Sequence, residues 1–169
     1  MKAAAAAEGR EEKVNTREGK YLTFTLAEEE YGIGILKVKE IIGMIAITSV
    51  PQTPSHVKGV INLRGKVIPV IDLRLKFGLP AMEYTERTCI IVIEIAKDHD
   101  HILLGILVDS VSEVLNIKGA DIENTPNFGT RLNTDYILGM AKTGGKIKIL
   151  LDIDKVMNAD DIAAIEQTL

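Results

Sequence analysis

The sequence has no tryptophan and only one cysteine, with three phenylalanines and four tyrosines among 169 residues. A single cysteine, Cys89, cannot form a disulfide within the chain, so we expect a reducing compartment. Cys89 lies in the run 88–95, where its neighbours are apolar strand residues, whereas a nucleophilic cysteine needs a base and an electropositive setting. This setting indicates a buried structural thiol and not a nucleophile.

Long hydrophobic runs and an excess of positive charge are also missing. No apolar stretch approaches the roughly 20 residues that cross a bilayer, and the alanine-rich start lacks the apolar segment of a signal peptide. The net charge is −4, and residues 21–169 carry 15 positive against 20 negative charges. A nucleic-acid partner needs a concentrated basic face. We therefore expect a cytoplasmic protein that neither inserts into a membrane nor binds nucleic acid.

Clusters of catalytic or metal-binding residues are scarce. The sequence has no glycine-rich phosphate loop, and the acidic run 28–30 falls at an expected hairpin turn, where charge is usual. The densest group of possible ligands, Asp98-His99-Asp100-His101, lies between two strand-like runs, where a polar turn is needed. We interpret it as a solvated turn and expect no metal site and no cofactor.

Strand-forming residues dominate what is present. Hydrophobic residues make up 46% of the chain and are mainly Ile, Val and Leu, whose branched side chains suit pleated sheets. Short apolar or alternating segments follow one another between turn residues, at 21–26, 31–35, 41–50, 57–63, 67–73, 88–95, 102–108, 111–117, 136–141 and 147–151. They predict an all-β protein with a helical turn at 73–77 and a short C-terminal helix at 159–169.

An internal repeat defines the expected architecture. Segment 57–73 aligns with 137–153 at a constant offset of 80, which superposes two glycines, a lysine and an aspartate of each copy: Gly59, Gly65, Lys66 and Asp72 on Gly139, Gly145, Lys146 and Asp152. The repeat predicts two five-stranded, SH3-like β-barrels, formed by residues 20–85 and 86–158 after a flexible tail at 1–19. A single ten-stranded sandwich is the alternative.

Four strings in the sequence resemble the CheW family. They are EEYGI at 29–33, VKGVINLRG at 57–65, IPVIDL at 68–73 and GILVD at 105–109. The resemblance covers about residues 20–158 as one CheW-like domain, and the second string is a distinctive one. It implies the two SH3-like barrels and a non-enzymatic scaffold in chemotaxis signal transduction, a two-component system.

The resemblance also implies two partners. These are the regulatory domain of the chemotaxis histidine kinase CheA and the cytoplasmic tip of methyl-accepting chemoreceptors, so the protein would be recruited to membrane-associated receptor arrays. We expect the isolated chain to be monomeric. The alternative, a ligand-binding or enzymatic small β-barrel, requires polar groups that converge in a pocket, and no spacing in the sequence suggests them.

The resemblance further implies where each partner binds. It places an apolar kinase-facing patch at Leu22, Ile35 and Val38, although the strand pattern equally allows Leu22 and Ile35 to point into the core. The residues near a receptor groove between the barrels are Val38, Glu40, Gly59, Asn62, Arg64, Val108 and Val111.

Differences between the two repeats indicate which of these residues serve function. Both copies have a glutamate, Glu40 or Glu113, but Arg64 aligns with Gly144. A feature found in one copy is a candidate for added function, and the resemblance places both Glu40 and Arg64 near the receptor groove. We therefore hypothesise that Arg64 pairs with Glu40 beside that groove. Asp72 and its counterpart recur in both copies, which favours a structural role as helix caps.

Overall fold

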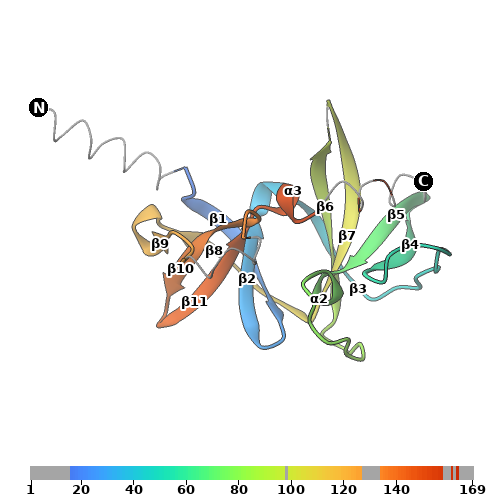
Figure 1. Ribbon diagram of the computed structural model, residues 1–169, viewed down its shortest axis with the longest axis horizontal. Coiled ribbons are helices and arrows are strands. Elements are labelled where there is room, and N and C mark those ends of the chain that lie inside the picture. Colours follow the sequence, from blue (N-terminus) through green and yellow to red (C-terminus); the bar gives the residue numbers. More distant parts are fainter. Residues whose placement is uncertain (1–15, 98, 127–133, 158–160, 162, 164–169) are drawn as a thin grey trace, which may run out of the picture.

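The computed structural model describes residues 16–97, 99–126, 134–157, 161 and 163. Most of the predicted tail and most of the predicted C-terminal helix at 159–169 lie outside these residues. The described chain forms a six-stranded and a five-stranded sheet, which lie side by side in Figure 1. Within the described residues, no helix combines the length and the hydropathy needed to cross a membrane.

The six-stranded sheet has the order β8-β1-β2-β11-β10-β9 and the five-stranded sheet has the order β3-β6-β7-β5-β4. The six strands are β1 (Gly19–Leu26), β2 (Glu29–Gly34), β8 (Ser110–Ile117), β9 (Ile122–Glu123), β10 (Ile137–Thr143) and β11 (Lys146–Leu151). The five strands are β3 (Val38–Gly43), β4 (Val57–Leu63), β5 (Lys66–Asp72), β6 (Cys89–Lys97) and β7 (Asp100–Val108). The short helical elements are η1 (Ile35–Lys37), α2 (Leu73–Lys76), η2 (Gly119–Asp121) and α3 (Ile153–Val156).

The predicted all-β class, with two duplicated barrel-like halves, is confirmed. The sheets, however, do not follow the expected division between residues 85 and 86. Hairpin β1–β2 joins strands from the second repeat, and hairpin β6–β7 joins strands from the first. Each repeat therefore lends its first hairpin to the other sheet, and β9 adds a short sixth strand to one of them.

The repeated hairpins β4–β5 and β10–β11 show why the glycines recur. Each pairs in antiparallel register around a two-residue turn, and both turn residues have positive φ: 50° and 86° at Arg64 and Gly65, 57° and 78° at Gly144 and Gly145. A turn of this kind matches the twist of a hairpin and favours glycine. Each hairpin then pairs in parallel with the exchanged hairpin of its sheet.

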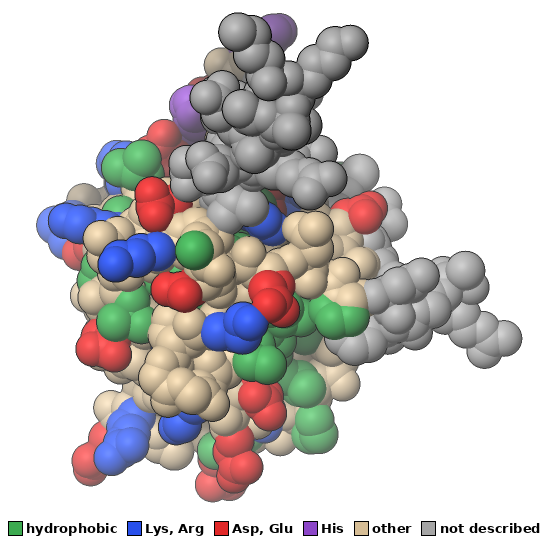
Figure 2. All heavy atoms as spheres, turned by 90° about the vertical axis from the view of Figure 1, so that its left-hand side faces the viewer, with side chains coloured by type: hydrophobic (Ala, Val, Ile, Leu, Met, Phe, Trp, Pro, Cys, Tyr) green, Lys and Arg blue, Asp and Glu red, His purple; other side chains and the backbone are tan. Residues whose placement is uncertain are grey.

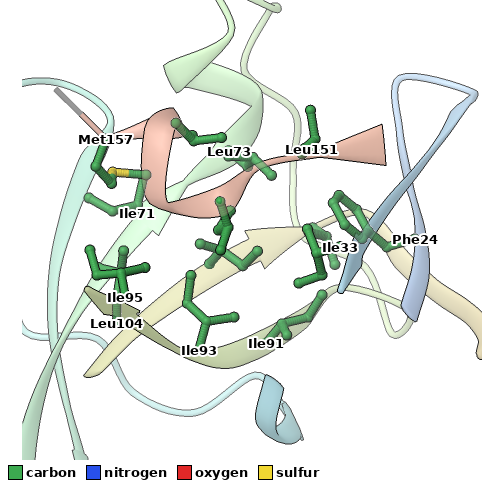
Figure 3. Packing of buried hydrophobic residues seen from close by; sticks show 14 of the residues in the cluster. Phe24, Ile33, Ile71, Leu73, Ile91, Ile93, Ile95, Leu104, Leu151 and Met157 are labelled. Carbon is green, nitrogen blue, oxygen red and sulfur yellow. The ribbon is translucent and has the colours of Figure 1, made fainter. Parts of the chain in front are cut away.

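The largest apolar cluster lies between the sheets. Figure 3 shows Phe24 and Ile33 from the six-stranded sheet facing Ile91 and Ile93 from the five-stranded sheet. Each sheet also has one smaller apolar cluster of its own. Because the exchanged hairpins supply side chains to the shared cluster, burial of apolar surface joins the two halves into one folded unit.

Short helical turns follow the repeated hairpins, as the sequence predicted for residues 73–77. The carboxylate of Asp72 accepts hydrogen bonds from the backbone N–H groups of Arg74 and Leu75 and so caps α2. Its counterpart Asp152 makes no side-chain cap bond to α3, so the predicted second cap is wrong. The recurrence of aspartate in both copies was not sufficient evidence for a shared cap.

Candidate partner-binding site

The structure contains the predicted ion pair between Glu40 and Arg64. Both guanidinium Nη atoms of Arg64 donate to the Glu40 carboxylate, with a distance of 3.2 Å for Nη1 to Oε2. The hydrogen bond from Arg64 holds the pKa of Glu40 below its usual value of 4.5, and Glu40 raises the pKa of Arg64 in return. The pair ties the β4–β5 turn to strand β3 and fixes the direction of both side chains.

Arg64 occupies a backbone conformation that suits glycine better. Its φ is 50°, in the left-handed region, and the equivalent turn position in the other repeat is Gly144 with a φ of 57°. A residue with a β-carbon costs roughly 1–2 kcal/mol in this region. An exposed ion pair returns only about 0–1 kcal/mol, so stability alone does not account for arginine at this position.

A pocket of about 410 Å³ lies beside the ion pair in the five-stranded sheet. Its apolar lining comes from four side chains of four strands, namely Leu63, Ile68, Val92 and Leu103. Charged side chains line it as well, and two of them, Lys39 and Glu94, form an ion pair at 3.0 Å. An apolar lining with charged neighbours is suited to one apolar side chain of a partner that carries a polar residue nearby.

The six-stranded sheet has a pocket at the equivalent place, with different chemistry. At the offset of 80, Gly144 replaces Arg64 and Lys148 replaces Ile68 among its lining residues. Lys148 is buried and pairs with Glu30, which also lines this pocket. Figure 2, which views this end of the molecule, shows acidic, basic and hydrophobic side chains intermixed across the face. The apolar version of the pocket therefore occurs in one repeat.

The remaining predicted receptor residues fall into three situations. Asn62 is exposed, and its side-chain oxygen accepts a hydrogen bond from the Gly65 N–H at 2.9 Å, so it shapes the turn that carries Arg64. Gly59 is buried and has a φ of 141°, and a β-carbon there would overlap the backbone of Thr48. Val108 is buried in the shared core. Gly59 and Val108 are therefore held within the fold, and their role in receptor binding stays a prediction.

Val38 and Val111 come from different sheets but contact the same core. Both are partly buried and pack against the shared apolar cluster, from β3 and β8 respectively. Val111 is not on the sheet that carries Glu40 and Arg64. These two valines therefore lie along the junction of the sheets, whereas the ion pair lies on the five-stranded sheet.

The residues of the predicted kinase-facing patch differ in exposure. Leu22 is 1% exposed and belongs to the shared core, so it does not line a surface patch. Ile35 and Val38 are partly exposed. Between them lies Leu36, which the sequence analysis did not single out and which is 92% exposed. The alternation of Tyr31, Ile33 and Ile35 predicts a continuing strand, whereas η1 breaks the alternation and turns Leu36 outward.

Other candidate sites are also located. Cys89 is half-buried and not fully buried as predicted, and its thiol donates to the backbone oxygen of Arg87 at 3.1 Å. Asp98 lies outside the described residues and His99 is in a turn, whereas Asp100 and His101, predicted as turn residues, begin strand β7; all three described residues are exposed. Among the residues that the structure describes, no three His, Cys, Asp or Glu side chains are placed to hold a metal ion.

Comparison with known proteins identifies relatives across most of the chain. The family model "CheW-like domain" matches residues 20–161. The chain is 41% identical over 146 residues to a chemotaxis protein CheW of Klebsiella aerogenes, with 86% of each chain covered. It is 34% identical over 155 residues to a chemotaxis protein CheW of Helicobacter pylori, covering 92% of this chain and 91% of that one.

A solved structure agrees with these relatives. The crystal structure of the scaffolding protein TtCheW from Thermoanaerobacter tengcongensis superposes with a TM-score of 0.74 at 37% sequence identity. The match covers 85% of this chain and 95% of the other. The fold is therefore shared with a protein named as a scaffolding protein.

Proposed function

The chain belongs to the CheW family, and we propose that it couples chemoreceptors to the chemotaxis histidine kinase CheA. It is a non-enzymatic adaptor of chemotaxis signalling. An adaptor of this kind needs at least two separate partner surfaces on one rigid body. The proposal assigns those surfaces to the Glu40–Arg64 pair and to the apolar patch at Ile35, Leu36 and Val38, which is called the η1 patch below.

The receptor-binding surface is the rim of the 410 Å³ pocket. The observation that supports this assignment is an arginine held in a left-handed turn, paired with Glu40, where the duplicate turn has glycine. An unfavourable backbone conformation at an exposed side chain suggests a functional requirement. A helix from a receptor tip would place an apolar side chain in the pocket and a polar residue against the ion pair.

The kinase-binding surface is the η1 patch. A leucine that is 92% exposed does not stabilise the isolated fold, but burying it in an interface is favourable by about 1.5–3 kcal/mol. Anchors of this kind contribute most when they fill a partner's pocket. The kinase regulatory domain would bury Leu36 together with the exposed parts of its two neighbours, and the bound protein would lie at membrane-associated receptor arrays.

Two variants separate these assignments. The purified protein is tested by biolayer interferometry against an immobilised receptor-tip fragment and against the kinase regulatory domain. Arg64→Ala is expected to weaken receptor binding selectively. Leu36→Asp is expected to weaken kinase binding by about 30-fold, which corresponds to the roughly 2 kcal/mol of an anchor residue. Ile147→Asp, another exposed apolar residue at a hairpin end, is the matched control and should bind both partners normally.

The opposite pattern would reject the assignment. If Leu36→Asp binds the kinase domain like the unmodified chain, the η1 patch is not the kinase surface. If Arg64→Ala keeps full receptor binding and instead melts early, Arg64 has a structural role. Equal loss of both partners in the Ile147→Asp control would show that any added charge disturbs binding.

A further inference from the structure

Along the described strands, the chain crosses between the two sheets at two places. The first crossing is η1, which leads from β2 in the six-stranded sheet to β3 in the five-stranded sheet. The second is Asp109, which lies between β7 in the five-stranded sheet and β8 in the six-stranded sheet. Each crossing carries a charged side chain that is paired with a short helix of the other repeat.

The second crossing is held by Asp109. Its Oδ2 atom accepts a hydrogen bond from Arg74 Nη1 at 2.8 Å and another from the backbone N–H of Ala27 at 2.8 Å. Arg74 belongs to α2, next to the five-stranded sheet, and also donates through Nε to the Pro80 backbone oxygen at 3.0 Å. Ala27 lies in the β1–β2 turn of the six-stranded sheet, with a φ of 49°. One carboxylate therefore joins both sheets and supports a left-handed turn.

The first crossing is held by Asp154. Its Oδ2 atom accepts from Lys37 Nζ at 2.6 Å, and its Oδ1 atom accepts from the backbone N–H of Ala96 at 3.0 Å. Lys37 is the last residue of η1, Ala96 lies near the end of β6 in the five-stranded sheet, and Asp154 belongs to α3 after β11 of the six-stranded sheet. Again one carboxylate, one cation and one backbone N–H meet between the sheets.

The two arrangements share two equivalent positions under the internal repeat. Adding the hairpin offset of 80 to Arg74 gives Asp154. In the six-stranded sheet, Leu22 and Phe24 pair with Val114 and Val111. In the five-stranded sheet, Ile91 and Ile93 pair with Ile41 and Val38. Because Val114 and Val111 are the repeat counterparts of Ile41 and Val38, Leu22 and Phe24 correspond to Ile91 and Ile93. That is an offset of 69, which takes Ala27 to Ala96. Both the helix residue and the N–H donor therefore coincide, whereas the crossing residues differ by one position, because Lys37 aligns with Ser110 and not with Asp109.

The charges are reversed between the two places. In one, the helix residue is the cation and the crossing residue is the carboxylate; in the other, the helix residue is the carboxylate and the crossing residue is the cation. In both, the carboxylate receives the N–H of the equivalent alanine. Coincidental surface ion pairs have no reason to repeat at equivalent positions with the same backbone partner.

We propose that these groups are two clamps that hold the exchanged hairpins in a fixed position relative to the rest of the fold. The Arg74 clamp comprises Arg74, Asp109 and the Ala27 N–H; the Asp154 clamp comprises Asp154, Lys37 and the Ala96 N–H. The apolar core between the sheets is non-directional, whereas charge-assisted hydrogen bonds specify an orientation. The clamps are therefore positioning groups and not binding groups.

The clamps also adjoin the proposed binding residues. Lys37 lies between Leu36 and Val38 of the η1 patch. Asp109 lies between Val108 and Val111 along the sheet junction. A shift at either crossing would therefore move the residues that flank it. The Arg74 side chain is 12% exposed and the Lys37 side chain is 38% exposed, so the Arg74 clamp is the better shielded from solvent and should be less sensitive to salt.

The first test uses the two alanine amides as reporters. Hydrogen exchange of the full-length chain is followed by two-dimensional NMR, well below the melting temperature. Arg74→Met should raise exchange at Ala27 and leave Ala96 unchanged, and Lys37→Met should do the reverse, by about 10-fold in each case. Lys142→Met, which breaks the Lys142–Glu123 pair within one sheet, is the matched control and should alter neither. Unchanged reporters, or an equal rise at all amides, would overturn the clamps.

The second test converts one clamp to the polarity of the other. Arg74→Asp places two carboxylates together and should lower Tm by roughly 5 °C, an amount typical for disrupting a partly buried pair in a chain of this length. Adding Asp109→Lys reverses the pair and gives it the charge order of the Asp154 clamp. The double variant should recover more than half of the lost Tm and restore protection at Ala27. Losses that add in the double variant would refute the equivalence.

The effect on binding rests on the proposed function and can fail independently. Lys37→Met should weaken kinase binding by about 3–10-fold through displacement of the η1 patch, and high salt should mimic the variant. If exchange at Ala96 rises while kinase binding is unchanged, the clamp stands and the assignment of the η1 patch fails. If both remain unchanged, the clamp itself is rejected.

Discussion

Replacing Arg64 with glycine separates the stability of the β4–β5 turn from its role in binding. The left-handed φ of 50° costs roughly 1–2 kcal/mol with an arginine, and glycine removes that cost. Glycine also favours the unfolded chain by about 0.5–1 kcal/mol, because its backbone has more conformational entropy to lose on folding. Loss of the exposed ion pair with Glu40 costs about 0–1 kcal/mol more. These terms nearly cancel, so the free energy of unfolding should change by less than about 1 kcal/mol.

The assay combines urea denaturation with receptor binding on the same samples. Arg64→Gly should unfold near the original midpoint while receptor binding weakens by about 10-fold or more, since an anchoring charge at an interface contributes about 1.4 kcal/mol or more. Gly144→Arg is the reciprocal control, because it introduces the strain without the pair and should cost roughly 1 kcal/mol of stability with receptor binding intact. An Arg64→Gly protein that unfolds early and binds receptor normally would refute the reasoning.

Three further outcomes are expected. Leu22→Asp should unfold the protein because it buries a charge in the shared core, whereas Leu36→Asp should melt within about 2 °C of the unmodified chain; circular dichroism distinguishes them. Gly59→Ala should cost on the order of 3 kcal/mol, since its φ of 141° and the adjacent backbone leave no room for a β-carbon, and urea denaturation measures this. The carboxyl pKa of Glu40, followed by NMR titration, should lie below 4.5 and return toward it in Arg64→Ala. Because this pKa is lowered by folding, the pair contributes fully above pH 4.5 and its contribution disappears as the pH falls through the lowered value.

The strand content and both repeated hairpins were predictable from local sequence. Alternating apolar residues and the two turn glycines, Gly65 and Gly145, are short-range signals that each hairpin carries within itself. The exchange of hairpins between sheets was not predictable in this way. It depends on where the chain goes after Gly34 and after Val108, and those directions are set by packing on a core that both repeats share. A repeat in the sequence predicts units of equal structure but not which units pair in space.

Some residues of the candidate site were likewise predictable from the sequence and others were not. The Glu40–Arg64 pair was predicted from two signals: the repeat singled out an arginine with no counterpart, and the family resemblance placed it near Glu40. The structure contains the pair. Leu22 shows the opposite case, because the sequence pattern around an apolar strand residue is the same whether its side chain faces a partner or the core. Leu36 was missed because a three-residue helical turn leaves no periodic signal. The hydrogen-bond partners of Asp109 and Asp154 were not predictable from the sequence either, because each partner comes from a segment distant in sequence.

The central claim is that one chain joins a receptor to the kinase, and co-assembly tests it most directly. A receptor-tip fragment, the kinase regulatory domain and this protein are mixed and separated by size-exclusion chromatography with light scattering. The account predicts a complex that contains all three when the unmodified chain is present, loss of the kinase domain alone with Leu36→Asp, and loss of the receptor fragment alone with Arg64→Gly. If the unmodified chain binds either partner only in the absence of the other, the two surfaces coincide and the adaptor account is contradicted.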